Sequence, residues 1–274
     1  MAIRVNMSND PTWVLSTAGA YLAAEPVFHN LLLTLLRARI AHYEPGRYWI
    51  AWDDDRVCGV VFQSPLDVPA NVAVMGTEVI VAMVDAIADA GIALPGVNGE
   101  AATAARFAGQ WAERCKAAAK PFRGERLYEL GEVREGPAIN GHLRNAMLPD
   151  RDLLIDWLGR FAAEAGVTVS DPEVQVDRWI PAQQMWIWDD GEPVSMAVSR
   201  ECAEGVVRLA FVYTPLERRR SGYGEACVRH LSRRIFREGH RPILYTDLGN
   251  PTSNSIYRRI GYRAVAEGLR YRFE

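Results

Sequence analysis

The chain has 274 residues, of which 49% are hydrophobic and 24% are charged, and its formal net charge at pH 7 is −3. This length allows one large domain or two ordinary ones, and the composition is that of a soluble folded protein rather than of a disordered or fibrous chain. The longest apolar stretch, Val79 to Leu94, is interrupted by Asp85 and Asp89, so a membrane span is not expected. The first residues lack the apolar core of a secretion signal, and we expect a cytoplasmic protein.

The first half of the chain predicts helices and strands in alternation. Val27 to His42 carries apolar residues at helical spacing, and Trp52 to Gln63 has the pattern of a β-hairpin with an acidic turn. Further helices are predicted at 78–90 and 101–118, followed by a strand at 126–130.

The second half repeats this order. Trp188 to Ser199 aligns without gaps on Trp52 to Gln63, and it also follows a helical stretch, Arg151 to Ala165. Two copies of one fold are therefore predicted, joined near residues 131–141. The alternative is a chance similarity of two hairpins, because a match of twelve residues is short.

The second copy contains a predicted phosphate-binding turn. An apolar strand at 206–213 leads into the Gly-rich stretch Arg219 to Gly224, which opens a helix ending near Arg237. Gly222 and Gly224 let several backbone N–H groups converge on one anion, and Arg218, Arg219 and Arg220 add positive charge beside them. The turn lacks the ending of a nucleotide-hydrolase P-loop and the spacing of a dinucleotide fingerprint. An ordinary tight turn is the alternative.

A second strand and helix complete this segment. The strand is predicted at 243–247, and Asn250 and Pro251 suit the N-cap and the first position of a helix. Asn254 and Tyr257 are three residues apart, so they share one face of that helix.

These two elements together resemble the acyl-CoA-binding half of the GNAT superfamily of N-acyltransferases. Residues 219–224 match its [QR]-x-x-G-x-[GA] pyrophosphate loop, and residues 250–257 are similar to its Asn-Pro-x-Ser-Asn-x-x-Tyr element. The resemblance implies an α/β (α+β) fold with two tandem GNAT-like copies, each a mixed, mainly antiparallel sheet flanked by helices. The residues it implies for acetyl-CoA binding are Val212, Tyr213, Thr214, Arg219, Arg220, Ser221, Gly222, Tyr223, Gly224, Asn250, Asn254 and Tyr257.

The resemblance also implies the chemistry. Strands 206–213 and 243–247 would splay apart, and N–H groups near Val212 and Tyr213 would polarise the thioester carbonyl while a primary amine attacks it. Tyr257 would protonate the departing thiolate. A carboxylate would remove a proton from the amine, with Asp247 as first candidate and Glu217 as second, although Asp247 could equally cap a turn.

The predicted organisation is a degenerate GNAT-like domain at 1–135 and an acetyltransferase domain at 136–274. The first copy has only Gly76 and the acidic Glu78 where the second has its arginine and glycines. The cysteines and histidines form no cluster at ligand spacing, so no metal is expected.

Several questions stay open at this stage. The acceptor is a small-molecule or peptide amine of unknown identity, and the protein could be a monomer or a homodimer. Other classes are a catalytically inactive CoA-binding or interaction module and, because of eight arginines between 218 and 241, a nucleic-acid-binding protein. We expect neither nucleic acid nor a membrane as a partner.

Overall fold

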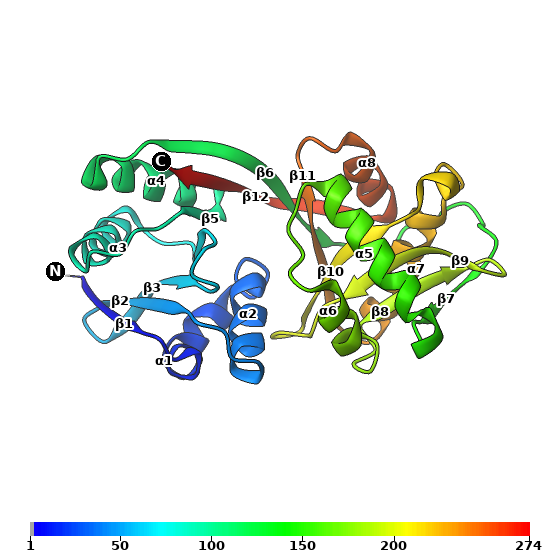
Figure 1. Cartoon of the computed structure of the whole chain (residues 1–274), viewed down its shortest axis with the longest axis horizontal. Helices are drawn as coiled ribbons and strands as arrows, with labels where there is room; N and C mark the ends of the chain where they lie inside the picture. Colours follow the sequence, from blue (N-terminus) through cyan, green and yellow to red (C-terminus); the bar gives the residue numbers. More distant parts are fainter. Residues whose placement is uncertain (1–2) are drawn as a thin grey trace. The chain divides into compact units, whose positions relative to one another are not determined.

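The computed structural model describes residues 3–274, which form two copies of one order of elements. Each copy runs strand, two helices, three strands, helix, strand, helix, strand (Figure 1). The first copy consists of β1 (Arg4–Ser8), α1 (Pro11–Ala24), α2 (Asn30–Ala41), β2 (Arg47–Asp53), β3 (Arg56–Gln63), β4 (Ala70–Val72), α3 (Thr77–Asp89), β5 (Gly96–Glu100), α4 (Ala101–Cys115) and β6 (Ala119–Leu130). The second consists of β7 (His142–Asn145), α5 (Arg151–Ala165), α6 (Pro172–Trp179), β8 (Met185–Asp189), β9 (Pro193–Ser199), β10 (Val206–Tyr213), α7 (Tyr223–Arg237), β11 (Arg241–Asp247), α8 (Pro251–Ile260) and β12 (Tyr262–Phe273).

The internal repeat predicted from the two hairpins is therefore present as a repeat of whole elements. Strands β2 and β3 pair antiparallel, as do β8 and β9, so both hairpins form as expected. The pattern did not reveal α1 and α6, nor the short strands β1 and β7. Asp10 caps α1 by accepting from the backbone N–H of Thr12 at 2.8 Å, a start signal that the sequence carries.

The chain divides into two compact units that do not follow the sequence strictly. Unit 1 contains the described residues up to Leu127 together with Thr246–Asn250 and Ala264–Glu274, and unit 2 contains Tyr128–Tyr245 and Pro251–Arg263. The division into 1–135 and 136–274 stays a prediction about the repeat. The compact units differ from it because the last strand of each copy contributes residues to both units.

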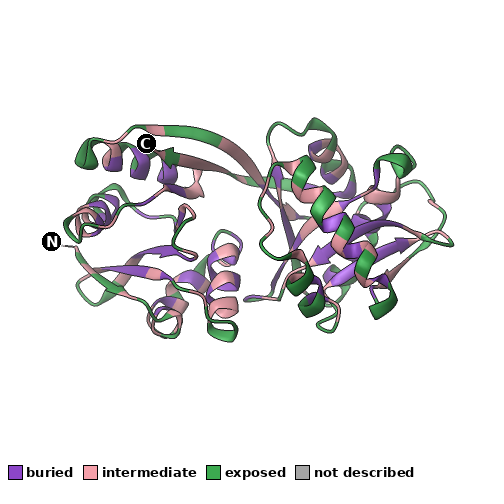
Figure 2. Cartoon of the chain, viewed as in Figure 1, coloured by how far each residue is buried: buried purple, intermediate pink, exposed green. Residues whose placement is uncertain are grey.

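Each unit is built on a mixed sheet. The strand order is β1-β2-β3-β4-β5-β12-β6 in unit 1 and β12-β6-β11-β10-β9-β8-β7 in unit 2. Strands β4 and β5 run parallel, as do β10 and β11. The successive pairs from β1 to β4 and from β7 to β10 are antiparallel. The central strands are largely buried and the helices are buried along one face (Figure 2). A mixed, mainly antiparallel sheet flanked by helices is confirmed.

The sheet of unit 2 has a separate core on each face. One core joins β8, β9 and β10 to α7 and α8 and includes Trp186, Trp188 and Leu231. The other joins the same strands to α5 and α6 and includes Trp157 and Trp179. Alternate residues of a strand face opposite sides, which explains how one short strand serves both cores.

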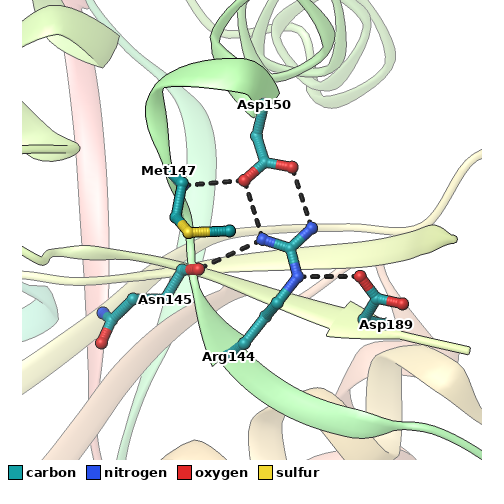
Figure 3. A network of polar contacts seen from close by, with 5 residues as sticks. All are labelled: Arg144, Asn145, Met147, Asp150 and Asp189. Carbon is teal, nitrogen blue, oxygen red and sulfur yellow. Dashed lines mark hydrogen bonds and ion pairs between the residues drawn. The ribbon is translucent and has the colours of Figure 1, made fainter. Parts of the chain in front are cut away.

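A polar network attaches the start of α5 to the strands (Figure 3). The Arg144 guanidinium donates to both carboxylate oxygens of Asp150, at 2.7 and 2.8 Å, and to Asp189 at 2.8 Å. Asp150 also accepts from the backbone N–H of Met147 at 2.7 Å. The bidentate bond from Arg144 holds the pKa of Asp150 below its usual value. This network fixes the start of α5, whose last turn carries Glu164.

Candidate functional site

The predicted phosphate-binding turn lies between β10 and α7. A 3₁₀ turn at Leu216–Arg218 follows β10, and the chain enters α7 at Gly222. Both Arg220 and Gly222 have left-handed backbone conformations, with φ of +66° and +82°. Left-handed residues directly before a helix N-terminus are typical of turns whose successive N–H groups face one anion.

Both glycines of this turn lie against neighbouring atoms. A Cβ on Gly222 would lie 2.8 Å from Cδ1 of Ile139, and a Cβ on Gly224 would lie 2.9 Å from Oγ1 of Thr214. The Thr214 hydroxyl is itself within 3.0 Å of the Ser195 hydroxyl, which also donates to the carbonyl of Tyr213 at 2.9 Å. The end of β10 is thus fixed directly beneath the first turn of α7, and glycine is required there for close approach.

Arg219 is held in place by groups from three elements. Its Nε donates to the carbonyl of Thr214 at 2.9 Å, and its guanidinium lies 5.8 Å from the centre of the Tyr213 ring. The same guanidinium forms an ion pair with Glu164, and the Tyr213 hydroxyl donates to that carboxylate at 3.3 Å. Burial and the charge of Glu164 raise the pKa of Tyr213. Glu164 therefore partly neutralises the charge of Arg219.

Two further contacts connect the turn to the hairpin of β8 and β9. Arg218 forms an ion pair with Glu192, and the hydroxyl of Tyr223 donates to Asp190 at 2.7 Å. The acidic turn that defined the sequence repeat therefore provides acceptors for the turn before α7. Arg220 and Ser221 are exposed, and no described residue forms an ion pair with Arg220.

Strands β10 and β11 separate as predicted. Their parallel register ends at the pair Leu209 and Leu244, four residues before β10 ends. On its other side β10 carries a bulge between Ala210 and Tyr213, where Phe211 has a φ of +51°. A bulge turns backbone groups out of the ladder and is typical of strands beside active sites. Val212 lies within the bulge, and pairing with β9 resumes at Tyr213.

Helix α8 brings the predicted amide and phenol together with an aromatic residue of β6. Asn254 and Tyr257 are both buried, and the hydroxyl of Tyr128 donates to Oδ1 of Asn254 at 3.0 Å. The Tyr257 ring packs 6.3 Å from that of Tyr128 and 6.1 Å from that of Tyr262. Burial raises the pKa of Tyr257 to about 12, which a hydrogen bond with Ser253 partly offsets. At neutral pH the phenol is therefore protonated.

Asp247, at the end of β11, has the contacts of a capping residue. Its Oδ1 accepts from the backbone N–H of Gly249 at 2.7 Å, and its Oδ2 lies 3.1 Å from the Arg123 guanidinium. The N–H of Asn250 donates to the carbonyl of Asp247 at 3.1 Å and closes the turn. The structural role that we gave as its alternative is thus supported, and its role in proton transfer stays a prediction. Glu217 is exposed.

The first copy has a different turn at the equivalent place. Gly76 precedes α3 with a φ of −70°, and the hydroxyl of Tyr21 donates to the carbonyl of Val74 at 2.6 Å. Glu78 lies in the first turn of α3. This turn has neither the left-handed backbone nor the arginines of the second copy.

Sequence reasoning did not identify Glu164, Ser195, Asp190 and Tyr128 as neighbours of the site. Each lies far from it along the chain, and no local pattern marks Glu164, Ser195 or Tyr128. For Asp190 the hairpin repeat was a usable signal.

Among residues 3–274, no cluster of three or more potential metal ligands occurs. None of the helices in this part of the chain has the length and apolar character that a membrane span requires.

The arginines of α7 are mostly bound to protein groups. Arg229 is buried and pairs with Glu225, and Arg233 contacts Glu135 at 2.9 Å. Arg234 lies 4.9 Å from the Trp186 ring. These three arginines therefore have partners within the protein, and the absence of a nucleic-acid partner stays a prediction.

Residues 190–271 match the family model described as FR47-like protein. No curated protein sequence matches the chain significantly.

Solved structures with the same fold cover almost the whole chain. An acetyltransferase of the GNAT family from Colwellia psychrerythraea is 9% identical with a TM-score of 0.68, over 99% of this chain and 100% of that one. A GCN5-related N-acetyltransferase from Kribbella flavida is 19% identical with a TM-score of 0.59, over 91% and 95%. A tandem GNAT protein from the clavulanic acid biosynthesis pathway is 11% identical with a TM-score of 0.57, over 98% of each chain. The predicted fold of two tandem GNAT-like copies is confirmed.

Proposed function

We propose that this chain, a two-lobed protein of the GNAT fold, transfers an acyl group from acyl-CoA to a primary amine. The observation that carries the proposal is the turn from Arg219 to Gly224, where left-handed backbone, a helix N-terminus and two arginines meet. It lies within the segment that matches the FR47-like model, as does the helix with Asn254 and Tyr257. Acetyl-CoA is the donor expected from the sequence.

The second copy would bind the cofactor. Backbone N–H groups at the start of α7, together with Arg219 and Arg220, would hold the diphosphate. Gly222 and Gly224 allow this approach, while the first copy offers an acidic residue at the same place. Asn254 would hydrogen-bond the pantetheine arm, and Asn250 would order the start of α8. Thr214, Ser221 and Tyr223 would line the entry to the cofactor site.

Catalysis would consist mainly of positioning and charge stabilisation. The bulge in β10 interrupts its pairing with β9 between Ala210 and Tyr213, and we propose that backbone groups of Val212 and Tyr213 would stabilise the oxyanion that forms as the amine attacks the thioester. The C–N bond forms, the C–S bond breaks, and the electron pair leaves on sulfur. Tyr257 would donate a hydrogen bond to that thiolate. We propose that it also protonates this thiolate, as expected from the sequence, and its pKa of about 12 keeps the phenol protonated until then.

An attacking amine must first lose its proton, and Asp247 is the carboxylate we propose for this step. Its Oδ2 lies 3.1 Å from the Arg123 guanidinium, which would hold the carboxylate in place. Replacing Asp247 by Asn should lower turnover about 100-fold or more if it is the base, since general-base catalysis contributes about 10²–10⁴. An unchanged pH profile would restrict Asp247 to capping the turn.

The test is CoA release from acetyl-CoA with a panel of primary amines. We expect amine-dependent release by the wild type and reduced release by Tyr257→Phe, with acetyl-CoA affinity nearly unchanged. Tyr262→Phe is the matched control, because Tyr262 is also a buried phenol but is bonded to Ser232 at 2.7 Å. Binding of acetyl-CoA without release for any amine would instead support the catalytically inactive module.

A further inference from the structure

Two arginines lie side by side on the α5–α6 face of the sheet in unit 2. The backbone N–H of Arg200, directly after β9, donates to the carbonyl of Arg208 in β10 at 2.8 Å. Arg200 follows Met196 and Val198 at alternate positions, and both belong to the core beneath α5 and α6. The neighbours of Arg208, Val207 and Leu209, belong to the opposite core, which directs Arg208 to the α5–α6 face as well.

Arg200 has an unusual environment for an arginine. Its guanidinium lies 4.8 Å from the centre of the Trp179 ring, and the side chain is only partly exposed. Burial and the neighbouring charge of Arg208 lower its pKa to about 10, against a smaller opposite effect of exposed Glu201. No carboxylate of residues 3–274 lies within ion-pair distance of the Arg200 guanidinium, which lies over the Trp179 indole instead. Such a cation is costly unless an anion joins it.

These arginines lie close to the proposed reaction centre. The Trp179 ring that stacks with Arg200 also packs 5.2 Å from the ring of Phe211, the left-handed residue of the bulge. Arg208 pairs with Ile243, one residue before the point where β10 and β11 separate. The Trp179 indole therefore contacts both Arg200 and Phe211 of the bulge.

The proposed place of the cofactor would put these arginines on the acceptor side. The turn proposed to bind the diphosphate follows the C-terminal end of β10, so the thioester of a cofactor held there would lie toward the bulge. Arg208 and Arg200 lie beyond the bulge, toward the N-terminal end of β10. An amine, or the far end of a long acyl chain, would occupy this region, and two guanidinium groups would be within reach of its substituents.

We propose that Arg200 and Arg208 bind a carboxylate of the substrate next to the thioester, so that the enzyme selects a carboxylate-bearing substrate. The inference rests on the proposed function. The carboxylate has two possible sources, the acceptor, as in an amino acid, or the acyl chain, as in a dicarboxylic acyl-CoA. In both cases paired guanidinium groups hold a planar carboxylate in a bidentate manner.

The experiment compares acids with their neutral amides. One arm uses acetyl-CoA with amino acids and the corresponding amino-acid amides, and the other uses succinyl-CoA and acetyl-CoA with a neutral amine. We expect the wild type to prefer the acid in one arm by about tenfold or more in kcat/KM. Arg200→Gln should remove this preference by raising KM for the acid while leaving the neutral substrate unchanged. Arg237→Gln, at an exposed position of α7, is the control.

Binding measurements keep the inference separate from the proposed function. Intrinsic tryptophan fluorescence should change on titration with the preferred acid but not with its amide, and this change should be smaller in Trp179→Phe; the measurement requires no turnover. Calorimetry should show coenzyme A binding to Arg200→Gln as tightly as to the wild type. Arg200→Lys retains the positive charge but not the two parallel donors of the guanidinium, and we expect it to retain part of the preference for the acid. This variant serves as the test if Arg200→Gln folds poorly.

Equal rates and equal binding for acids and amides in both arms would overturn the inference. So would an equal loss by Arg200→Gln for acid and neutral substrates, which would restrict Arg200 to packing against Trp179. Absence of acyl transfer with every amine would instead refute the proposed function, and the fluorescence titration would still decide whether the arginines bind a carboxylate.

Discussion

Replacing Gly222 by Ala tests whether the turn before α7 binds the cofactor. Gly222 has a φ of +82°, and an added Cβ would lie 2.8 Å from Cδ1 of Ile139. A left-handed conformation costs a residue with a Cβ about 1–2 kcal/mol, so the free energy of unfolding should fall by about that amount. If the turn changes its backbone conformation to relieve this strain, its N–H groups would move away from the diphosphate of coenzyme A. Loss of one charge-assisted hydrogen bond, about 1.5–3 kcal/mol, would weaken coenzyme A binding roughly 10- to 100-fold.

Gly239→Ala is the matched control for this change. Gly239 has a φ of +84° just beyond the end of α7, and no atom lies within 4 Å of an added Cβ. Urea unfolding should show a similar loss of stability for both variants, whereas calorimetric titration should show weaker coenzyme A binding for Gly222→Ala alone. Equal affinities in the two variants would refute the assignment of the cofactor to this turn.

Two further changes test the surroundings of the site. Asp150→Asn should lower the free energy of unfolding by about 1–3 kcal/mol, because it breaks the bidentate bond from Arg144. Since folding lowers the pKa of Asp150, its contribution is present above the ordinary pKa of an aspartate and is lost as the pH falls through the folded value. Urea midpoints between pH 3 and 7 should therefore decline less steeply in acid for the variant, and parallel acid limbs would contradict this. Glu164→Gln should tighten coenzyme A binding a few-fold at low salt, because it frees Arg219 from its ion pair. Both side chains are well exposed, so 0.5 M salt should reduce this effect. Weaker binding by the variant would mean that Glu164 orients Arg219 for the ligand.

The local parts of the site were predictable from the sequence. Strand β10 begins and ends at the predicted residues, and α5 spans the predicted Arg151–Ala165. Hydrophobic periodicity sets such boundaries, because each short segment must bury its own apolar face. The glycines of the turn were equally readable, since only a residue without a Cβ combines a φ of +82° with the close approach of Ile139.

The partners of these residues were not predictable. Glu164 reaches Arg219 from 55 residues away, and Tyr128 reaches Asn254 from 126 residues away. No local rule selects one acidic residue or one tyrosine of many at such separations. Helices α1 and α6 were missed although Asp10 and Asp171 cap them, because the apolar residues of α1 do not gather on one face and α6 has only 8 residues.

By itself, the sequence determined the repeated order of elements, the Gly-rich turn before α7 and the placement of Asn254 and Tyr257 on one helix face, because backbone conformation and side-chain periodicity are local properties. Only the tertiary structure decided that β12 lies between β5 and β6 and that β6 lies between β12 and β11. It also decided that Arg200 and Arg208 lie side by side near the bulge of β10. The physical reason is that an exposed or edge strand has hydrogen-bonding groups that any other strand can satisfy, so the choice of partner depends on packing of the whole chain.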